Sequence, residues 1–290
     1  MVTGASGLVG RTLVPVLLAR DEVRACVRRP EAAEPLRALG TKVAVGRSDD
    51  ADALAEILQR VHTLIHLVGG PNQRDVEATL AANHGSVLIA LAAAREAGVR
   101  RFILVSAPGA ATDAEHPYLR AKGLAEEAVA NSRLEHAIIR STHAYGLGGL
   151  WFTTIVEGAL ATPPFVAGDG DQLLAPILAD DLAAVVAAAD DRQSAVSGTW
   201  AIEGPEVLTT SNLVARLGSS EERPTALSPA SAAVRLSEAL GVPMSPIAAQ
   251  YFTMPSRADA LDAAAEFGVE RTSLDAGLRL TMARAVASGR

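Results

Sequence analysis

The sequence is poor in cysteine, in lysine and in aromatic residues, and it contains no cationic block. Cys26 is the only cysteine, so no disulfide can form within the chain, which suits a reducing compartment. The 33 Asp and Glu residues outnumber the 26 Lys and Arg residues, and the net charge is −7. This balance argues against nucleic acid or an anionic membrane as the main partner.

Long hydrophobic runs are also missing. The stretch Ser86–Ala94 is among the longest, well below the roughly 18 residues that a membrane span needs. The N-terminus has no basic start, and Gly4 and Gly7 come before any hydrophobic stretch, so no signal peptide is expected. We therefore expect a cytoplasmic protein that does not bind a membrane.

Short apolar runs alternate with segments of helical periodicity in the first 140 residues. The apolar spacing of Leu54, Ile57 and Leu58 is typical of an amphipathic helix. Strands separated by such helices predict right-handed crossovers and a parallel sheet that is covered on both faces. The expected strands are Val23–Val27, Lys42–Val45, Thr63–Val68, Phe102–Val105 and Ala137–Ile139.

The first strand is unusually short. Only Met1, Val2 and Thr3 precede Gly4, although a buried strand normally has about five residues. Either the strand is truly short, or the natural chain begins upstream of Met1 with residues rich in Val, Ile and Leu. We favour the upstream start.

The pattern changes after Tyr145, where Gly146–Gly149 interrupts it. Strand and helix patterns return, and helices then dominate the C-terminal third. We expect a doubly wound Rossmann core, residues 1–145 and about 173–203, and a smaller, mostly helical substrate lobe, residues 146–172 and 204–290. The elements expected in this half are Leu173–Leu178, Asp180–Ala189, Gly198–Glu203, Ser211–Leu217, Ala230–Leu240, Arg257–Phe267 and Leu274–Ala287.

Three glycines are spaced three residues apart at the start of a helix expected over Leu8–Arg20. In a dinucleotide-binding loop, the first permits a tight turn, the second lets the backbone approach a pyrophosphate, and the third lets the helix pack on the sheet. Backbone N–H groups at the helix N-terminus then face the anion. The residues expected to bind phosphate are Gly4, Ser6, Gly7, Leu8, Val9 and Gly10.

The end of the second strand favours NADP(H) over NAD(H). A protein that binds NAD usually has an acidic residue there for the ribose 2′-hydroxyl. Here no acid occurs before Glu31, and Arg28 and Arg29 occupy the position. A guanidinium favours a 2′-phosphate through charge-assisted hydrogen bonds.

Tyr118 and Lys122 are four residues apart on an expected helix, so they share one face. Tyrosine has a reference pKa near 10, and a neighbouring ammonium favours its phenolate. With only three tyrosines and two lysines in the chain, this spacing rarely arises by chance.

The glycine loop, the strand end Val105–Ser106 and the Tyr118–Lys122 pair together resemble the short-chain dehydrogenase/reductase superfamily. Finer features resemble its extended and atypical branches, which include NAD-dependent epimerases, NmrA-like regulators and the nucleotide-binding accessory subunit of respiratory complex I. These features include the segments Ile65–Gly70, Asn83–Ser86, Gly98–Phe102 and Pro176–Asp181.

The resemblance implies roles for four residues: Tyr118 protonates a carbonyl oxygen, Lys122 binds the nicotinamide ribose and lowers the tyrosine pKa, Ser106 polarises the carbonyl, and Asn83 completes a proton relay. This chain departs from extended members at Ala107, where a second hydroxyl is usual. Further cofactor contacts are expected from Ser48, Val68, Gly69, Gly70, Ser141 and His143.

Other candidates leave alternatives open. Tyr145, Trp151 and Phe152 either line a substrate pocket or form the core of the small lobe. His62 and His66 lie four residues apart on an expected strand, about 13 Å, which is too far for one ion. No metal site is predicted.

The leading hypothesis is an NADPH-dependent oxidoreductase that acts on a carbonyl or an activated double bond of a small molecule. One alternative is a non-catalytic, NmrA-like NADP(H) sensor. The other is a nucleotide-sugar epimerase or dehydratase, which the missing hydroxyl at Ala107 and the presence of Arg28 disfavour. The protein is expected to be a monomer or a homodimer.

Overall fold

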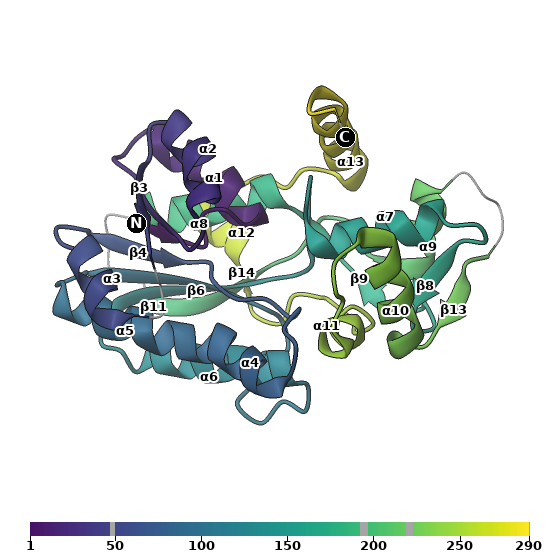
Figure 1. The fold of residues 1–290 in the computed structure, drawn as a ribbon, viewed down its shortest axis with the longest axis horizontal. Coiled ribbons are helices and arrows are strands. Elements are labelled where there is room, and N and C mark those ends of the chain that lie inside the picture. Colours follow the sequence, from purple (N-terminus) through teal and green to yellow (C-terminus); the bar gives the residue numbers. More distant parts are fainter. Residues whose placement is uncertain (47–49, 192–196, 219–222, 290) are drawn as a thin grey trace.

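The computed structural model describes residues 1–46, 50–191, 197–218 and 223–289, and within them one eight-stranded parallel sheet forms the centre of the molecule (Figure 1). The chain moves outward from β1 in one direction and then continues from β4 in the other, so the strand order reverses between these two strands. In such sheets, ligands bind outside the carboxyl ends of the strands at this reversal. The strands run in the order β3 (Lys42–Val45), β2 (Arg24–Val27), β1 (Val2–Thr3), β4 (Thr63–His66), β5 (Arg101–Ser106), β6 (Glu135–Ser141), β11 (Ser197–Ile202) and β14 (Leu261–Asp262).

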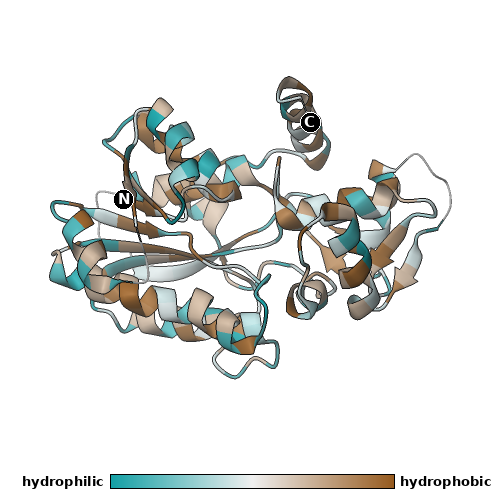
Figure 2. Ribbon diagram, viewed as in Figure 1, coloured by the Kyte–Doolittle hydropathy of each residue, from teal (hydrophilic) through white to brown (hydrophobic). Residues whose placement is uncertain are grey.

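Helices cover both faces of the sheet, which confirms the predicted doubly wound architecture (Figure 1). On β5, Ile103 faces one core cluster, whereas Phe102 and Leu104 face the other. Both faces of the strands are therefore buried, and Figure 2 shows the resulting hydrophobic strands between more polar helices. One face carries α1 (Leu8–Leu18), η1 (Pro30–Ala32), α2 (Ala33–Ala38), α8 (Ala179–Asp191) and α12 (Ala263–Phe267), and the other carries α3 (Ala51–Ile57), α4 (Val76–Leu80), η2 (Ala81–Gly85), α5 (Ser86–Glu96) and α6 (Pro117–Ala130).

A smaller lobe lies beyond the carboxyl ends of the strands (Figure 1). The chain has ten aromatic residues (two Trp, three Tyr and five Phe), and seven of them lie in the core cluster of this lobe. They are Tyr118, Tyr145, Trp151, Phe152, Phe165, Tyr251 and Phe252.

Short strand pairs and helices make up this lobe and its connections to the sheet. The pairs β7–β10 and β8–β13 are parallel, and β9–β12 is antiparallel. The elements are β7 (Ala144–Tyr145), α7 (Leu150–Leu160), β8 (Phe165–Ala167), β9 (Leu173–Leu174), β10 (Ile177–Leu178), β12 (Leu208–Thr209), α9 (Thr210–Leu217), β13 (Thr225–Leu227), α10 (Pro229–Leu240), α11 (Pro246–Tyr251) and α13 (Leu274–Ala287).

The helix predicted over Arg257–Phe267 is wrong in its first half. Leu261 pairs with Trp200 as part of β14, and only Ala263–Phe267 is helical. The physical reason is a helix cap, because the Asp262 carboxylate accepts hydrogen bonds from the backbone N–H groups of the first turn of α12. β14 therefore extends the core sheet and α12 packs on its face, so neither element joins the small lobe. The run expected at Leu173–Leu178 divides into β9 and β10.

The continuous helical stretch Val76–Glu96 is long and apolar enough to cross a membrane, by length and composition alone. This differs from the sequence expectation, which was based on uninterrupted apolar runs. Val87, Ala90 and Leu91 of this stretch lie in the core cluster between α5 and the sheet. Core helices of globular domains have the same character.

Candidate active site

A pocket of about 220 Å³ lies where the strand order reverses, at the carboxyl ends of β1, β4 and β5. It brings the glycine-rich loop together with three of the four predicted catalytic residues, although these segments are far apart in the sequence. The lining residues are Gly4, Gly7, Leu8, Val9, Gly10, Leu67, Gly69, Gly70, Val105, Ser106, Tyr118 and Lys122.

The glycine-rich loop has the geometry that a dinucleotide phosphate requires. Gly4 has a φ of +73°, and a Cβ there would lie 2.8 Å from the Leu67 carbonyl carbon. A Cβ at Gly10 would lie 2.5 Å from the Gly4 carbonyl oxygen. Gly7 precedes α1 without any side-chain cap, and no acidic residue occupies the first turn. Among the described residues no side chain caps this helix end, so its backbone N–H groups can bind an anion.

Gly69 and Gly70 form another wall of the pocket, which is held by Asn83. The Asn83 Oδ1 atom accepts a hydrogen bond from the Gly70 N–H at 2.8 Å, and its Nδ2 donates to the carbonyl oxygens of Gly70 and Thr79 at 3.1 and 2.9 Å. Asn83 lies in the π-helical turn η2, a feature often found at functional sites. Its fully buried side chain is thus committed to the Gly69–Gly70 wall.

Lys122 and Tyr118 project from α6 toward the end of β5. The Lys122 Nζ donates to the carbonyl oxygen of Val105 at 2.9 Å and lies 5.9 Å from the centre of the Tyr118 ring. The next residue, Ser106, ends β5, and its buried Oγ has no hydrogen-bond partner among the described residues. Ser106 lines the pocket, whereas Ala107 lies in the core of the small lobe.

Burial controls the electrostatics of the pair. It raises the pKa of Tyr118 well above its usual value, and it lowers the pKa of Lys122 to about 8, against the opposing effect of Glu126. Desolvation of the phenolate is the cause of the raised Tyr118 pKa, and the Lys122 ammonium donates its hydrogen bond to Val105. Tyr118 is therefore a protonated phenol at neutral pH.

The remaining expected cofactor residues are more scattered. Arg28 and Arg29 are exposed just beyond β2, which pairs with β1, and the Arg29 Nε lies 3.5 Å from a Glu31 carboxylate oxygen. The Ser141 hydroxyl donates to the Thr142 carbonyl oxygen at 2.9 Å. The residues that do not line the pocket are Ser6, Arg28, Arg29, Val68, Asn83, Ser141 and His143, and Ser48 lies outside the described residues.

The expected substrate residues Tyr145, Trp151 and Phe152 are 1%, 5% and 8% exposed and belong to the small-lobe core. Of the two alternatives, the structure agrees with the second, in which these residues form the core of the small lobe. The His143 ring stacks on Trp151 with centroids 4.7 Å apart, and burial lowers its pKa to about 3. His143 is therefore neutral at physiological pH.

Tyr251 is a neighbour of the site that sequence reasoning missed. Its ring meets the Tyr118 ring edge-on at 4.7 Å and the His143 ring at 5.1 Å. It comes from α11, so the small lobe reaches the predicted proton donor through this residue. No motif surrounds it, and the only sequence signal is that it is one of three tyrosines.

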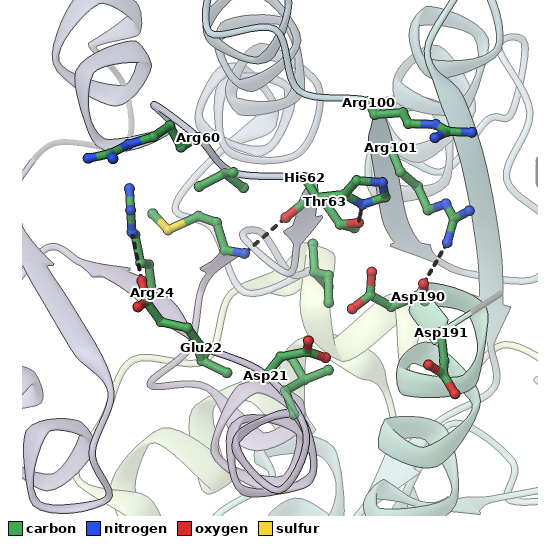
Figure 3. A pocket seen from close by; sticks show the side chains of 15 residues that line it. Asp21, Glu22, Arg24, Arg60, His62, Thr63, Arg100, Arg101, Asp190 and Asp191 are labelled. Atoms are coloured by element: carbon green, nitrogen blue, oxygen red, sulfur yellow. Dashed lines mark hydrogen bonds and ion pairs between the residues drawn. The ribbon is translucent and has the colours of Figure 1, made fainter. Parts of the chain in front are cut away.

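A separate pocket of about 520 Å³ lies at the opposite, amino-terminal edge of the sheet (Figure 3). Both acidic and basic side chains line it, including Asp21, Arg24 and Asp190. The Met1 amine donates to the Thr63 carbonyl oxygen at 2.9 Å there. None of the residues expected to act in catalysis lines this pocket, so the site at the carboxyl ends is the better candidate.

The two histidines considered as a metal pair have separate partners. The His62 Nδ1 is 2.9 Å from the Thr63 hydroxyl, whereas the His66 ring bridges the hydroxyls of Thr3 and Ser86 at 3.0 and 3.2 Å. Within the described ranges, no three His, Cys, Asp or Glu side chains are grouped as metal ligands would be.

Comparisons with known proteins agree with this geometry. Residues 4–147 match the family described as NAD(P)H-binding. The chain is 29% identical over 223 residues to the mitochondrial NADH dehydrogenase (ubiquinone) 1 alpha subcomplex subunit 9 of Arabidopsis thaliana, covering 73% of this chain and 55% of that protein. It is 31% identical over 189 residues to the 4-hydroxy-2-methyl-3-oxo-4-farnesyl-3,4-dihydroquinoline-1-oxide ketoreductase of Stigmatella aurantiaca, covering 62% of this chain and 53% of that protein. The chain thus spans about half the length of these two relatives.

The fold is similar to that of solved structures over its whole length. MoeE5 in complex with UDP-glucose and NAD superposes with a TM-score of 0.75 at 21% identity, covering 100% of this chain and 99% of that one. At this identity the similarity concerns the fold alone. The family match and the parallel, doubly wound sheet together show that the chain contains an NAD(P)-binding Rossmann domain, and the proteins that it is similar to include a complex I subunit, a ketoreductase and a protein solved with a nucleotide sugar and NAD.

Proposed function

We propose that the protein is an NADPH-dependent reductase that acts on a carbonyl group, or on an activated double bond, of a small molecule. The observation that carries this proposal is that Ser106, Tyr118 and Lys122 line the same pocket as the phosphate-binding glycines. The similarity to a ketoreductase supports a reductase over a purely regulatory protein.

The residues present fit a nicotinamide dinucleotide. The backbone N–H groups at the start of α1 can bind a pyrophosphate, and a ligand would provide the partner that the buried Ser106 Oγ lacks among the described residues. Lys122 uses one of its three N–H donors on Val105, which leaves two for ribose hydroxyls. A bound nicotinamide supplies the hydride that the carbonyl carbon accepts.

The side chains of this chain would handle the carbonyl oxygen. Ser106 donates a hydrogen bond to it and so stabilises the charge that develops there. Tyr118, which keeps its proton because it is buried, gives that proton to the oxygen. The nearby Lys122 ammonium then stabilises the phenolate that remains.

The preference for NADPH rests on Arg28 and Arg29. Both are exposed at the carboxyl end of β2, beside the strand that leads into the glycine loop. A guanidinium at this strand end can bind a 2′-phosphate, and no acidic residue lies between Val23 and Pro30 to bind a 2′-hydroxyl.

The test is NADPH oxidation in the presence of a panel of ketones and enones, measured for the parent and for Tyr118→Phe. The substitution removes one oxygen and keeps the ring, so we expect cofactor affinity to be unchanged and turnover to fall by about 10² to 10⁴. A sensor would bind NADPH and reduce no compound of the panel. An epimerase or dehydratase would retain tightly bound NAD and convert a nucleotide sugar instead.

A further inference from the structure

A network of ion pairs lies behind the catalytic helix and is centred on Arg140 of β6. Its Nε and one terminal nitrogen bind the Glu126 carboxylate at 3.0 and 2.7 Å, and its other terminal nitrogen binds Asp259 at 2.9 Å. Arg140 also donates to the Ala110 carbonyl oxygen at 2.9 Å, and Asp259 accepts from the Gly109 N–H at 2.7 Å. One guanidinium thus joins α6, the loop after Ser106 and a segment near the C-terminus.

Glu126 connects this network to the active site. It follows Lys122 by one helical turn, so the two side chains share one face of α6. Only 8% of Glu126 and 5% of Lys122 is exposed, and charges interact strongly in such a poorly hydrated setting. Arg140 donates hydrogen bonds to both carboxylate oxygens of Glu126, so the position of this charge is fixed.

The packing of α6 leaves it little freedom to move. A Cβ at Gly123 would lie 2.2 Å from the carbonyl carbon of Ala111, in the loop that the network also holds. The helix therefore lies directly against this loop. A change in the ion pairs acts on Lys122 through its electrostatic environment more than through displacement of the helix.

We propose that Glu126, clamped by Arg140, is a positioning residue that keeps the Lys122 ammonium charged in the pocket. This inference rests on the proposed function for the role of Lys122. Of the two carboxylates that bind Arg140, Glu126 is the one that lies on the Lys122 face of α6. Without it, burial alone would drive Lys122 toward its neutral form, which has lost one donor and its charge.

The other groups around Lys122 do not supply this charge. Tyr118 on its own helix is a neutral phenol, and burial lowers the pKa of His66, on β4, to about 3, so that ring is neutral as well. Tyr251 on α11 is an equally buried phenol. His84 lies on η2, which packs against α6, and is not an anion in any protonation state. Glu126 is the anion on the Lys122 face of α6.

The scarcity of lysine permits a direct test, because Lys42 and Lys122 are the only two lysines of the chain. Protein labelled with ¹³C at the lysine Cε gives two resonances, and Lys42→Arg identifies which belongs to Lys122. Each resonance is titrated from pH 6 to 11 in the cofactor-free parent, Glu126→Gln, Glu126→Asp and Asp259→Asn. Lys42, exposed beside Glu22, is the internal reference.

We expect Glu126→Gln to lower the Lys122 midpoint by at least half a pH unit and to leave the Lys42 midpoint unchanged. Glu126→Asp, which restores a carboxylate, should return it toward the parent value. Asp259→Asn also removes one negative charge that binds Arg140, but this charge does not lie on the Lys122 face of α6. It should therefore shift the Lys122 midpoint much less. A Lys122 midpoint that is unchanged in Glu126→Gln, or that shifts equally in Asp259→Asn, would overturn the proposal.

A second measurement, of NADP⁺ affinity between pH 7 and 10, separates this inference from the proposed function. In this pH range the 2′-phosphate does not take up its second proton, so its own titration does not affect the affinity. If Lys122 binds the cofactor in its charged form, Glu126→Gln should bind NADP⁺ about two- to threefold more weakly than the parent at pH 8.5 and nearly equally at pH 7. A shifted resonance with no change in affinity would support the positioning role and refute the cofactor role of Lys122.

Discussion

The Lys122 ammonium hydrogen bonds to the carbonyl oxygen of Val105, the residue that precedes Ser106 at the end of β5. This contact joins the catalytic helix to the strand that carries the candidate hydroxyl. The cation is consequently held 5.9 Å from the Tyr118 ring centre instead of being paired with the phenolic oxygen. Its charge is desolvated, so Lys122 is expected to lower the stability of the protein when no ligand is bound.

The first prediction follows from that cost. Lys122→Met should raise the free energy of unfolding of the cofactor-free protein at pH 7 by up to about 3 kcal/mol, because a folded-state pKa of about 8 against 10.5 disfavours the charged form in the folded state. Urea unfolding of both proteins measures the difference. With saturating NADPH, the parent should gain more stability than the variant.

The same substitution has a defined pH dependence. Between pH 8 and 10.5 the unfolded parent holds the Lys122 proton and the folded parent has released it, so the parent gains stability as the pH rises. The advantage of Lys122→Met should therefore shrink from pH 8 upward and be largely gone near pH 10.5. A constant difference across this range would show that Lys122 is not the desolvated cation described here.

A second prediction concerns Asn83. Asn83→Ala would remove the side-chain partner of the buried Thr79 carbonyl and those of both backbone groups of the half-buried Gly70, and a buried unsatisfied group costs about 1 to 3 kcal/mol. We expect the variant to lose about 2 to 4 kcal/mol of stability and to bind NADPH at least tenfold more weakly. Asn83→Asp keeps the acceptor for the Gly70 N–H but loses the donor, so its stability and NADPH affinity should lie between those of the parent and of Asn83→Ala. An Asn83→Ala protein with normal cofactor affinity would show that the Gly69–Gly70 wall does not contact the cofactor.

A third prediction tests whether the small lobe positions the proton donor. Tyr251→Leu removes the ring edge that contacts Tyr118, whereas Tyr251→Phe keeps it. Turnover of an accepted ketone should fall about tenfold in the leucine variant and stay within twofold in the phenylalanine variant. NADPH affinity should be unchanged in both, since Tyr251 does not line the cofactor pocket. Equal losses in the two variants would instead indicate that the hydroxyl of Tyr251 matters.

Local sequence features predicted the parts of the site that depend on spacing along the chain. Gly4, Gly7 and Gly10 form the expected loop because a Cβ at each position would approach backbone atoms a few residues away or at the end of the adjoining strand. Tyr118 and Lys122 share a face because helical geometry alone determines it. The doubly wound sheet follows from alternating periodicities in the same way.

Contacts between distant segments could not be read from these features. Asp259 and Arg140 are 119 residues apart, and nothing in either local sequence indicates their ion pair. Asp259 lies just before β14, in the stretch expected to be helical, where its carboxylate instead binds Gly109 and Arg140. Tyr251 meets Tyr118 only because the small lobe folds back onto α6. Such residues are identified by packing, which depends on the whole chain.

The final prediction concerns cofactor choice. The parent should bind NADPH at least tenfold more tightly than NADH, which corresponds to about 1.4 kcal/mol and is modest for a charge-assisted contact with a phosphate. Arg28→Ala combined with Arg29→Ala should remove most of this difference by weakening NADPH binding while leaving NADH binding nearly unchanged. Calorimetry with both cofactors measures the four affinities.

Arg37→Ala provides the matched control, since Arg37 is another exposed arginine but lies on α2, after the β2 end. It removes the same kind of charge without removing a candidate phosphate ligand, so it should keep the preference of the parent. Raising the salt concentration should weaken NADPH binding to the parent more than NADH binding, because only the former includes the 2′-phosphate contact. Equal affinities of the parent for the two cofactors would refute the role given to the arginines and leave the pocket without a basis for choosing between them.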